Sequence, residues 1–491
     1  MKLRDIPVST TSAPTSTPST QVYNWKRTVS GLAVLVALYL FVVYVVPRPV
    51  SVKPEGWRVT GIFLSVILGL IIQPIPIGAV VLLGVTMSAA LGGLTIDQAL
   101  LGWASPTVWL VITAFFMSRG LINCGLARRL ALYFVRLLGK TTLGVTYGLS
   151  ISDMVLAAMI PSNSARSGGI ILPIARTIAE LYGSTPGATA SVLGTFLITA
   201  VYQSICVTAS MFYTGQASNP LAARIAGSMG YQITWASWLF AASVPGLVSM
   251  LVVPWVVMRL ERPQIVRTPE AAAFAARELE AMGPMKRGEK ILVVVFAAVC
   301  ALWITSSTTH IDITVTALGG GLALLLTGVL SWDDIKGERN AWDIFVWYGG
   351  VIRLGTALNE FGVTKAFAQG VSDQFSTLGW MGLLAVALLI YFYAHYAFAS
   401  ITTHILAMFS PFVAVLLTKG APAGLTFFSF ACFSNFAAGL THYGTTPTPM
   451  FFASDYVSMK KWWKVGFVIS IVNLLIWSTV GFGWWKLIGL W

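Results

Sequence analysis

The chain has 491 residues, of which 56% are hydrophobic and only 10% are charged, and its formal net charge at pH 7 is +13. A soluble protein would carry roughly a quarter charged residues, so the composition excludes an ordinary soluble protein. The positive balance does not indicate nucleic-acid binding, because the basic residues stand at the ends of apolar segments, where the positive-inside rule expects them. Several apolar runs approach the ~20 residues that a helix needs to cross a bilayer. These runs are 31–46, 62–72, 190–211, 238–258, 291–304 and 465–485. We therefore predict an all-α polytopic membrane protein.

Residues 1–30 form a Ser/Thr/Pro-rich stretch that ends in Lys26 and Arg27. We predict a disordered cytoplasmic tail here, with no cleavable signal peptide. The same composition faintly resembles an organellar transit peptide, which is the alternative. The first membrane half then covers residues 31–258.

A short apolar segment with an aromatic start, residues 108–118, leads to Asn123 and Gly125. Residues 344–354 lead to Asn359 and Gly362 in a similar way, and the two glycines are 237 positions apart (362 − 125). Short, interrupted segments at matched positions indicate re-entrant hairpins at these two places. Alternatively both are ordinary spans, because hydropathy does not separate the two cases at roughly 20 residues each.

A run of small polar residues ending in a cation, residues 161–166 (Pro-Ser-Asn-Ser-Ala-Arg), lies between two apolar segments. We expect a helix over 145–160 to break at this motif and to resume through residue 174. Polar, cationic interruptions of membrane helices are costly and usually line a site. The exposed amides of the resumed helix carry roughly half a positive charge, which is enough to attract a carboxylate.

A second pair of interruptions follows the two serine motifs. Residues 213–220 and 443–449 place Gly, Thr and Pro where a membrane helix must unwind. Unwinding frees carbonyls for a cation and donors for an anion. Either stretch alone is equally well explained as a helix end at the interface, but the matched order favours a site.

Residues 259–290 contain seven Lys/Arg and five Asp/Glu, and prolines and glycine bracket an Ala-rich piece that we expect to be helical. We predict a cytoplasmic linker here, followed by a second membrane half over 291–491. The second half repeats the serine motif at residues 400–404 (Ser-Ile-Thr-Thr-His), and Ser400 follows Ser162 by 238 positions (400 − 162).

Charge indicates that the two halves are inverted. Residues 128–140 carry four basic residues and no acid, whereas the matching stretch of the second half carries only Lys365 against Asp373. Lysines at 460, 461 and 464 precede the last apolar run. The positive-inside rule then gives a cytoplasmic N-terminus, a C-terminus outside and about 11 spans.

The sequence offers no chemistry for an enzyme. The four cysteines are isolated in apolar surroundings without metal-type spacing, and we find no Walker motif and no nucleophile elbow. We therefore expect neither a cofactor nor a metal site. An anion channel is a further alternative, although the chain lacks a repeated ring-forming feature.

After residue 30, the chain resembles the divalent anion:sodium symporter family, and most closely its exchanger branch. That branch includes 2-oxoglutarate/malate translocators and citrate/succinate or tartrate/succinate antiporters. The matching motifs are residues 161–173 and 440–449. The resemblance implies an inverted repeat with two re-entrant hairpins and two broken helices, a homodimer, and an elevator motion of a transport domain against a scaffold.

The family pattern is a Ser-Asn-Thr triplet in each half, which contacts substrate carboxylates and helps to build two sodium sites. In the second triplet of this chain Ile401 replaces the asparagine, which removes an oxygen ligand and places the second sodium site in doubt. The substrate-binding residues that the resemblance implies are Ser162, Asn163, Ser164, Gly215, Ser400, Thr402, Thr445, Thr446 and Pro447.

Arg166 and His404 each stand four residues after the serine of their motif, and either cation could take the electrostatic place of a sodium ion. An uncompensated positive site would cross the membrane poorly when empty, which favours obligatory exchange. The alternatives are a structural pair of Arg166 with Asp153 or backbone carbonyls, and a neutral packed His404. We predict an inner-membrane antiporter of di- or tricarboxylates that works without sodium; a sodium-coupled dicarboxylate symporter is the second candidate.

Overall fold

The structure is a computed structural model that describes residues 25–374 and 379–491. All regular elements of its described part are helices, and the one β-bridge there is an isolated pair between Thr141 and Arg267. Within residues 25–374 and 379–491, eight helical segments are long and apolar enough to cross a membrane. These segments are Trp25–Val45, Pro54–Ile72, Pro106–Cys124, Gly194–Met211, Trp235–Leu260, Trp380–Ala397, Ile401–Thr418 and Met459–Leu487. The predicted all-α membrane fold is confirmed.

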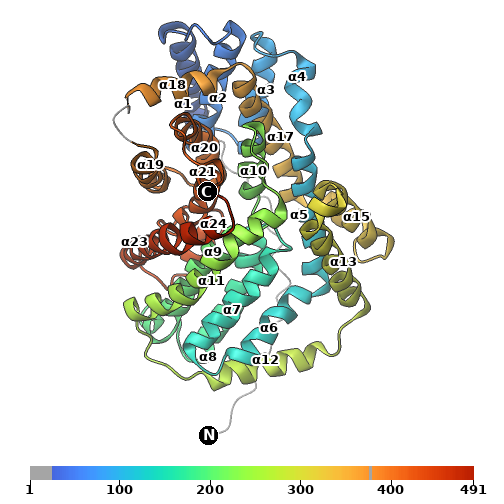
Figure 1. The fold of residues 1–491 in the computed structure, drawn as a ribbon. Coiled ribbons are helices and arrows are strands. Elements are labelled where there is room, and N and C mark those ends of the chain that lie inside the picture. The colour runs from blue at the N-terminus through green and yellow to red at the C-terminus, as the bar shows by residue number, and fades with distance from the viewer. Residues whose placement is uncertain (1–24, 375–378) are drawn as a thin grey trace.

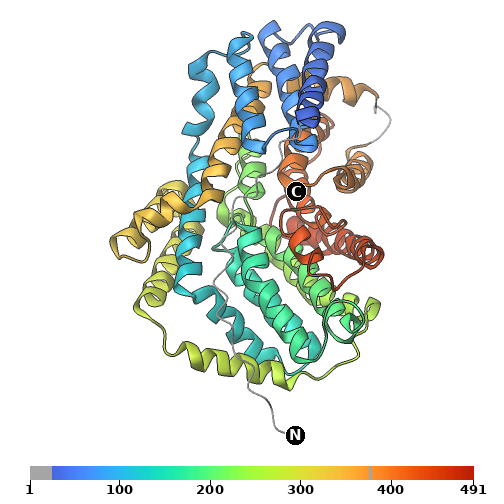
Figure 2. The same ribbon diagram turned by 180° about the vertical axis from the view of Figure 1, so that it is seen from behind.

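One group of helices packs along α17 (Arg339–Glu360) and α5 (Pro106–Cys124) (Figures 1 and 2). It comprises α1 (Trp25–Leu40), α2 (Pro54–Ile72), α3 (Ile77–Ala90), α13 (Arg287–Ile304) and α15 (Ile313–Leu326). Helix α1 begins at Trp25, so residues 25–30 are not part of a disordered tail as predicted. The Thr28 hydroxyl donates to the carbonyl of Pro74 (3.1 Å), which fixes this first turn against α2. Residues 1–24 of the predicted tail lie outside the described residues.

The predicted hairpins at 108–118 and 344–354 are wrong. Both segments lie inside continuous helices, α5 with 19 residues and α17 with 22. Polar residues flank each apolar window, but they continue the helix because its backbone hydrogen bonds do not depend on hydropathy. Each helix ends near a glycine in the left-handed region, Gly125 (φ 84°) and Gly362 (φ 77°). The short helices α6 (Leu126–Leu138) and α18 (Val363–Gln374) follow.

The re-entrant hairpins lie instead at the two serine motifs. In the first, α7 (Thr142–Ala157) leads to the motif, and a π-helical segment (Ser164–Ile171) continued by α8 (Leu172–Leu181) leads away from it. Both outer ends reach the linker: the amide of Thr142 donates to Val266 (3.0 Å) and the Tyr182 hydroxyl to Glu270 (2.5 Å). A chain that leaves on the side where it entered is a hairpin, so the motif is its tip and not a break in a spanning helix.

The second hairpin consists of α19 (Trp380–Ala394) and α20 (Ile401–Thr418). The ring of Trp380 packs edge-on against Trp491 (6.4 Å). Gly424, at the start of the helix that follows α20 (α21, Ala423–Ala437), lies against Leu490. Both outer ends of this hairpin therefore lie at the C-terminus of the chain.

A broken helix follows each hairpin, as predicted. The first is α9 (Gly194–Met211) and α10 (Ser218–Ser228), and the second is α21 (Ala423–Ala437) and α22 (Thr448–Phe452). The two run antiparallel: the Thr195 hydroxyl, at the start of α9, donates to the carbonyl of Tyr456, after α22 (2.8 Å). At the other end, Gly424 lies beside Tyr231, which follows α10. The inverted repeat is confirmed.

The expected helix of the linker is α12 (Pro269–Met282), which packs on α6 and runs along the outer ends of α7 and α8 (Figures 1 and 2). Lys461, at the start of α23 (Met459–Ile476), pairs with Glu261 at the end of α11 (Trp235–Leu260; 2.9 Å). The linker and the lysine-rich start of α23, which the charge pattern assigns to the same side of the membrane, therefore lie on the same face of the protein. The remaining short helices are α4 (Ile96–Leu100), α14 (Ser306–Thr309), α16 (Trp332–Gly337) and α24 (Phe482–Leu487).

Helix α23 supports the second unwound segment through Gly466. A methyl group at Gly466 would overlap the carbonyl oxygens of Gly439 and Leu440. We expect Gly466→Ala to destabilise the purified protein by about 1–3 kcal/mol, because backbone atoms cannot move aside as a side chain can. Thermal unfolding followed by tryptophan fluorescence measures this. Gly319→Ala in α15, where an added methyl meets no atom within 4 Å, is the control and should not lower the melting temperature. Equal melting temperatures of the two variants would contradict this account of the packing.

Candidate functional site

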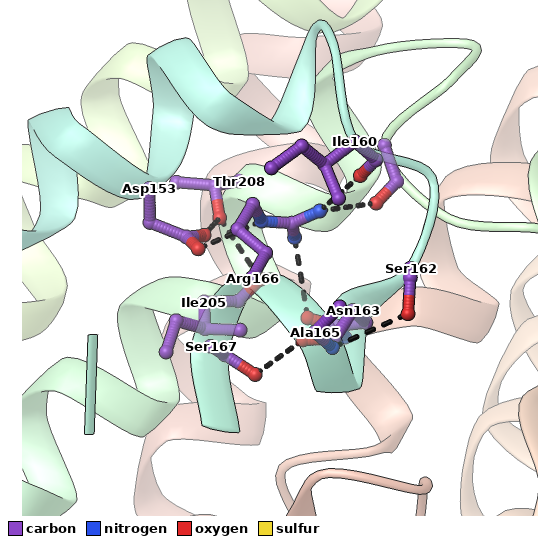
Figure 3. A network of polar contacts seen from close by, with 10 residues as sticks. Asp153, Ile160, Ser162, Asn163, Ala165, Arg166, Ser167, Ile205 and Thr208 are labelled. Carbon is purple, nitrogen blue, oxygen red and sulfur yellow. Dashed lines mark hydrogen bonds and ion pairs between the residues drawn. The ribbon is translucent and has the colours of Figure 1, made fainter. Parts of the chain in front are cut away.

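The tip of the first hairpin starts a helix at Ser162 and Asn163. The Ser162 hydroxyl accepts from the amide of Ala165 (3.2 Å), and the Ser167 hydroxyl donates to the carbonyl of Asn163 (2.5 Å; Figure 3). Ser162 and Asn163 are buried, whereas Ser164 is half-buried. The side-chain oxygen of Asn163 accepts from Arg166 (3.2 Å), and its amide NH2 has no hydrogen-bond partner in the described part of the chain. This NH2 group and the Ser164 hydroxyl, which also makes no hydrogen bond within the described residues, are the polar donors that the tip leaves unpaired.

Arg166 is completely buried and fully engaged with protein atoms (Figure 3). Its Nε donates to the Asp153 carboxylate (2.7 Å), and one terminal nitrogen donates to the carbonyls of Ile160 (2.9 Å) and Gly215 (2.8 Å). The Asp153 carboxylate also accepts from the Thr208 hydroxyl. The prediction of Arg166 as an uncompensated charge is therefore wrong, because a buried carboxylate neutralises it. The guanidinium instead fills a cage of protein oxygens and fastens the hairpin tip to the first unwound segment.

The second tip is organised by Ser400, which caps α20: its hydroxyl accepts from the amide of Thr403 (3.4 Å). Thr402 and Ser400 are half-buried, whereas Ile401 is buried and apolar. Ser400 thus caps the N-terminus of α20, as Ser162 caps the helix that begins at the first tip.

His404 is also buried, but its role differs from the predicted one. Its Nδ1 lies 3.2 Å from Nδ1 of His395, and Nε2 of His395 lies 2.8 Å from the carbonyl oxygen of Gly444. Nε2 of His395 must donate to that carbonyl, so its Nδ1 accepts and Nδ1 of His404 donates. Nε2 of His404 then holds a lone pair with no partner among the described residues. A further proton there would find no acceptor, so His404 is a neutral packed histidine and not a charge-compensating cation.

The two unwound segments, residues 212–217 and 438–447, face these tips. Gly215 is held by Arg166, and Gly444 by His395. Thr445 is buried, and its amide donates to Thr448 (3.1 Å), whereas Thr446 is exposed and Pro447 precedes α22. The structure therefore brings the predicted residues of each half together, with Ser164, Thr402 and Thr446 at the open edges.

A buried amide network joins the two broken helices, and the sequence analysis did not assign it. Nδ2 of Asn435 donates to Asn219 (3.1 Å), and Gln216 donates to the side-chain oxygen of Asn435. Gln203 and Tyr202 donate to the carbonyls of Gly439 and Ala438 (both 3.0 Å). The available signal was the lone amide of Asn435 in an apolar membrane helix, since such residues are expensive and usually functional.

The described residues contain no group of three or more His, Cys, Asp or Glu side chains that could hold a metal ion. The polar side-chain groups of the tip residues include the Asn163 amide NH2 and the hydroxyls of the half-buried Ser164 and Thr402. Such an arrangement suits an anion with several oxygen acceptors, and the two helix N-termini add partial positive charge.

The model of the sodium:sulfate symporter transmembrane region matches residues 26–491. The Bacillus subtilis protein YflS, provisionally named a malate transporter, is 42% identical over 462 residues, which cover 94% of this chain and 96% of that protein. The chloroplastic dicarboxylate transporter 1 of Spinacia oleracea is 40% identical over 454 residues (92% and 80%). Among solved structures, the YdaH transporter of Alcanivorax borkumensis matches with a TM-score of 0.55 and 12% identity, covering 82% of this chain and 89% of that one. The last likeness concerns the fold alone.

We expect Arg166→Lys to lose nearly as much thermal stability as Arg166→Ala, since an ammonium group cannot reach the acceptors that the planar guanidinium reaches. Breaking a buried pair on one side costs about 3–5 kcal/mol, so Asp153→Asn should be similarly unstable. The double variant Asp153→Asn/Arg166→Gln removes both charges and should recover part of the loss. Thermal unfolding of the purified variants measures each effect, and wild-type stability of Arg166→Lys would show that charge alone is sufficient.

Proposed function

We propose that this chain, which belongs to the sodium:sulfate symporter transmembrane family, is a secondary active antiporter that exchanges di- or tricarboxylates. The names of its relatives, malate and dicarboxylate transporters, support carboxylates as the substrate class and transport rather than catalysis. We further propose that it works without sodium, in the cell inner membrane, as a homodimer with an elevator motion.

One observation carries the proposal of sodium independence. In each half, unwinding of the broken helix leaves one glycine carbonyl without its helical hydrogen bond, and a protein N–H group donates to that carbonyl instead. The donor is Arg166 for Gly215 and His395 for Gly444. A sodium ion would need such oxygens as ligands. Ile401, which is buried at the second tip, offers no oxygen in their place.

Obligatory exchange follows from the donors that remain. The empty site leaves the Asn163 amide NH2 without a protein acceptor, and Ser162 and Ser400 each cap only one amide of the helix that begins at their tip, so the positive ends of these two helices are left without an anion. A bound dicarboxylate satisfies them. The loaded carrier should therefore cross the membrane more readily than the empty one.

The substrate contact is tested by Asn163→Asp. Aspartate keeps the oxygen that accepts from Arg166 but removes the NH2 donor, and it adds a negative charge against a dianion. A hydrogen bond to a charged group contributes about 1.5–3 kcal/mol, so we expect a loss of roughly 10- to 150-fold in apparent substrate affinity. Counterflow of malate, succinate, 2-oxoglutarate, citrate and tartrate in proteoliposomes measures it. Asn163→Ala should also lose exchange, and wild-type kinetics in either variant would remove Asn163 from the substrate site.

Sodium independence is tested by replacing external sodium with choline or potassium at constant ionic strength. We expect the exchange rate to stay unchanged, and uptake to require substrate inside the vesicle and to saturate. A rate that rises saturably with sodium, together with uptake into empty vesicles, would favour the sodium-coupled symporter instead.

A further inference from the structure

A second polar cavity lies between α10 and the ends of α5, α15 and α17, with a volume of about 570 Å³. We call it the α10 vestibule. Its polar lining includes Tyr213, Arg224, Gln232, Asp312, Asn359 and Glu360, and none of the hairpin-tip residues described above lines it.

The α10 vestibule opens on the face of the protein remote from the linker. Pro106, Asp312 and Glu360 mark the helix ends that meet there, and Thr314 donates to the carbonyl of Pro106 (3.2 Å). At the other end of α5, Gly125 lies against Met282 of α12. Since α5 has 19 residues, its two ends are about 28 Å apart.

Both carboxylates of the vestibule already accept hydrogen bonds from other groups of the protein. Glu360 holds Arg353 through two oxygens (2.9–3.0 Å). Asp312 caps α15, where its carboxylate accepts from the amide of Thr314 (2.7 Å) and is offset by the positive end of that helix. Arg224, by contrast, is exposed and makes no hydrogen bond or ion pair within residues 25–374 and 379–491. Arg224 is therefore the cation of the lining that no protein carboxylate engages within the described residues.

Tyr213 connects the vestibule to the candidate substrate site. It directly precedes Thr214 and Gly215, the latter held by Arg166, and its ring packs against Trp238 (5.9 Å). Its hydroxyl has no hydrogen-bond partner among the described residues. The unwound segment 212–217 thus contacts the hairpin tip through Gly215 and the vestibule through Tyr213.

We propose that Arg224 and Tyr213 form an outer binding site for the dicarboxylate dianion, which is captured there before it reaches the hairpin tips. This proposal rests on the proposed function. A guanidinium binds carboxylate oxygens with two parallel N–H groups, and the phenol adds a third donor. A single cation in a walled cavity also raises the local concentration of dianions and their rate of association.

The test uses sidedness, because the vestibule serves only one face of the membrane. We measure the KM of exchange from each side separately, in phosphatidylcholine proteoliposomes of known protein orientation. Arg224→Gln should raise KM on the vestibule side roughly 3- to 10-fold, with maximal rate and linker-side KM unchanged, and high salt should shrink the difference. Arg224→Lys keeps the charge but not the two parallel N–H groups, so its KM on the vestibule side should lie between those of the wild type and Arg224→Gln. Lys53→Gln, an exposed lysine at the start of α2 that removes the same charge outside the cavity, should change neither KM.

Three results would overturn the proposal. The first is an unchanged KM on both sides in Arg224→Gln, and the second is an equal change on both sides with a loss of maximal rate, which would indicate a structural role. The third is an effect that is seen only when anionic lipid is added to the vesicles, which would assign Arg224 to a lipid headgroup. Exchange by the wild type is the separate control: if the wild type exchanges no dicarboxylate, the proposed function fails, and not the vestibule alone.

Discussion

The centre of this protein depends on how the carbonyl oxygens of its two unwound segments find hydrogen-bond donors. Backbone without a partner is tolerated at membrane depth only where protein or a water-filled cavity surrounds it. In the first half Arg166 supplies the donors, and Asp153 balances its charge from α7. In the second half a chain of two neutral histidines reaches Gly444. Each hairpin tip is therefore locked to the broken helix of its own half before any ligand is considered.

The two locked halves are joined by amides. Asn435 connects the second broken helix to Asn219 of the first, and Gln203 holds Gly439 from α9. Every residue of α9 is buried, so this helix is surrounded by protein along its whole length. Hydrogen bonds and close packing therefore connect the two unwound segments directly. These two hairpins and two broken helices pack together as one connected unit.

The sequence was sufficient to predict the class of protein, the helix in the linker, the two broken helices and the positions of the two serine motifs. It misplaced the hairpins, because residues 108–118 and 344–354 look short only when their polar flanks are excluded from the helix. Whether a segment forms a hairpin or spans the membrane depends on contacts with residues distant in the sequence. Tyr182 at the end of the first hairpin contacts Glu270, and Trp380 at the start of the second contacts Trp491. Likewise, the four-residue spacing suggested cations at Arg166 and His404. Only the structure shows that Asp153 neutralises one and that His395 orients the other.

The offset of 238 positions that relates Arg166 to His404 also relates Asp153 to Tyr391 (153 + 238 = 391). Where the first half has an ion pair, the second has Tyr391 packed against His404, with ring centroids 4.2 Å apart and the ring planes tilted by 30°. An arginine at 404 opposite a tyrosine would bury an unpaired charge, and so would an aspartate at 391 opposite a neutral imidazole. The two halves are therefore not interchangeable one residue at a time. If the halves descend from one duplicated gene, the two positions of each pair had to change together. A chimera that exchanges Arg166 or His404 between the halves must therefore also exchange its partner, Asp153 or Tyr391.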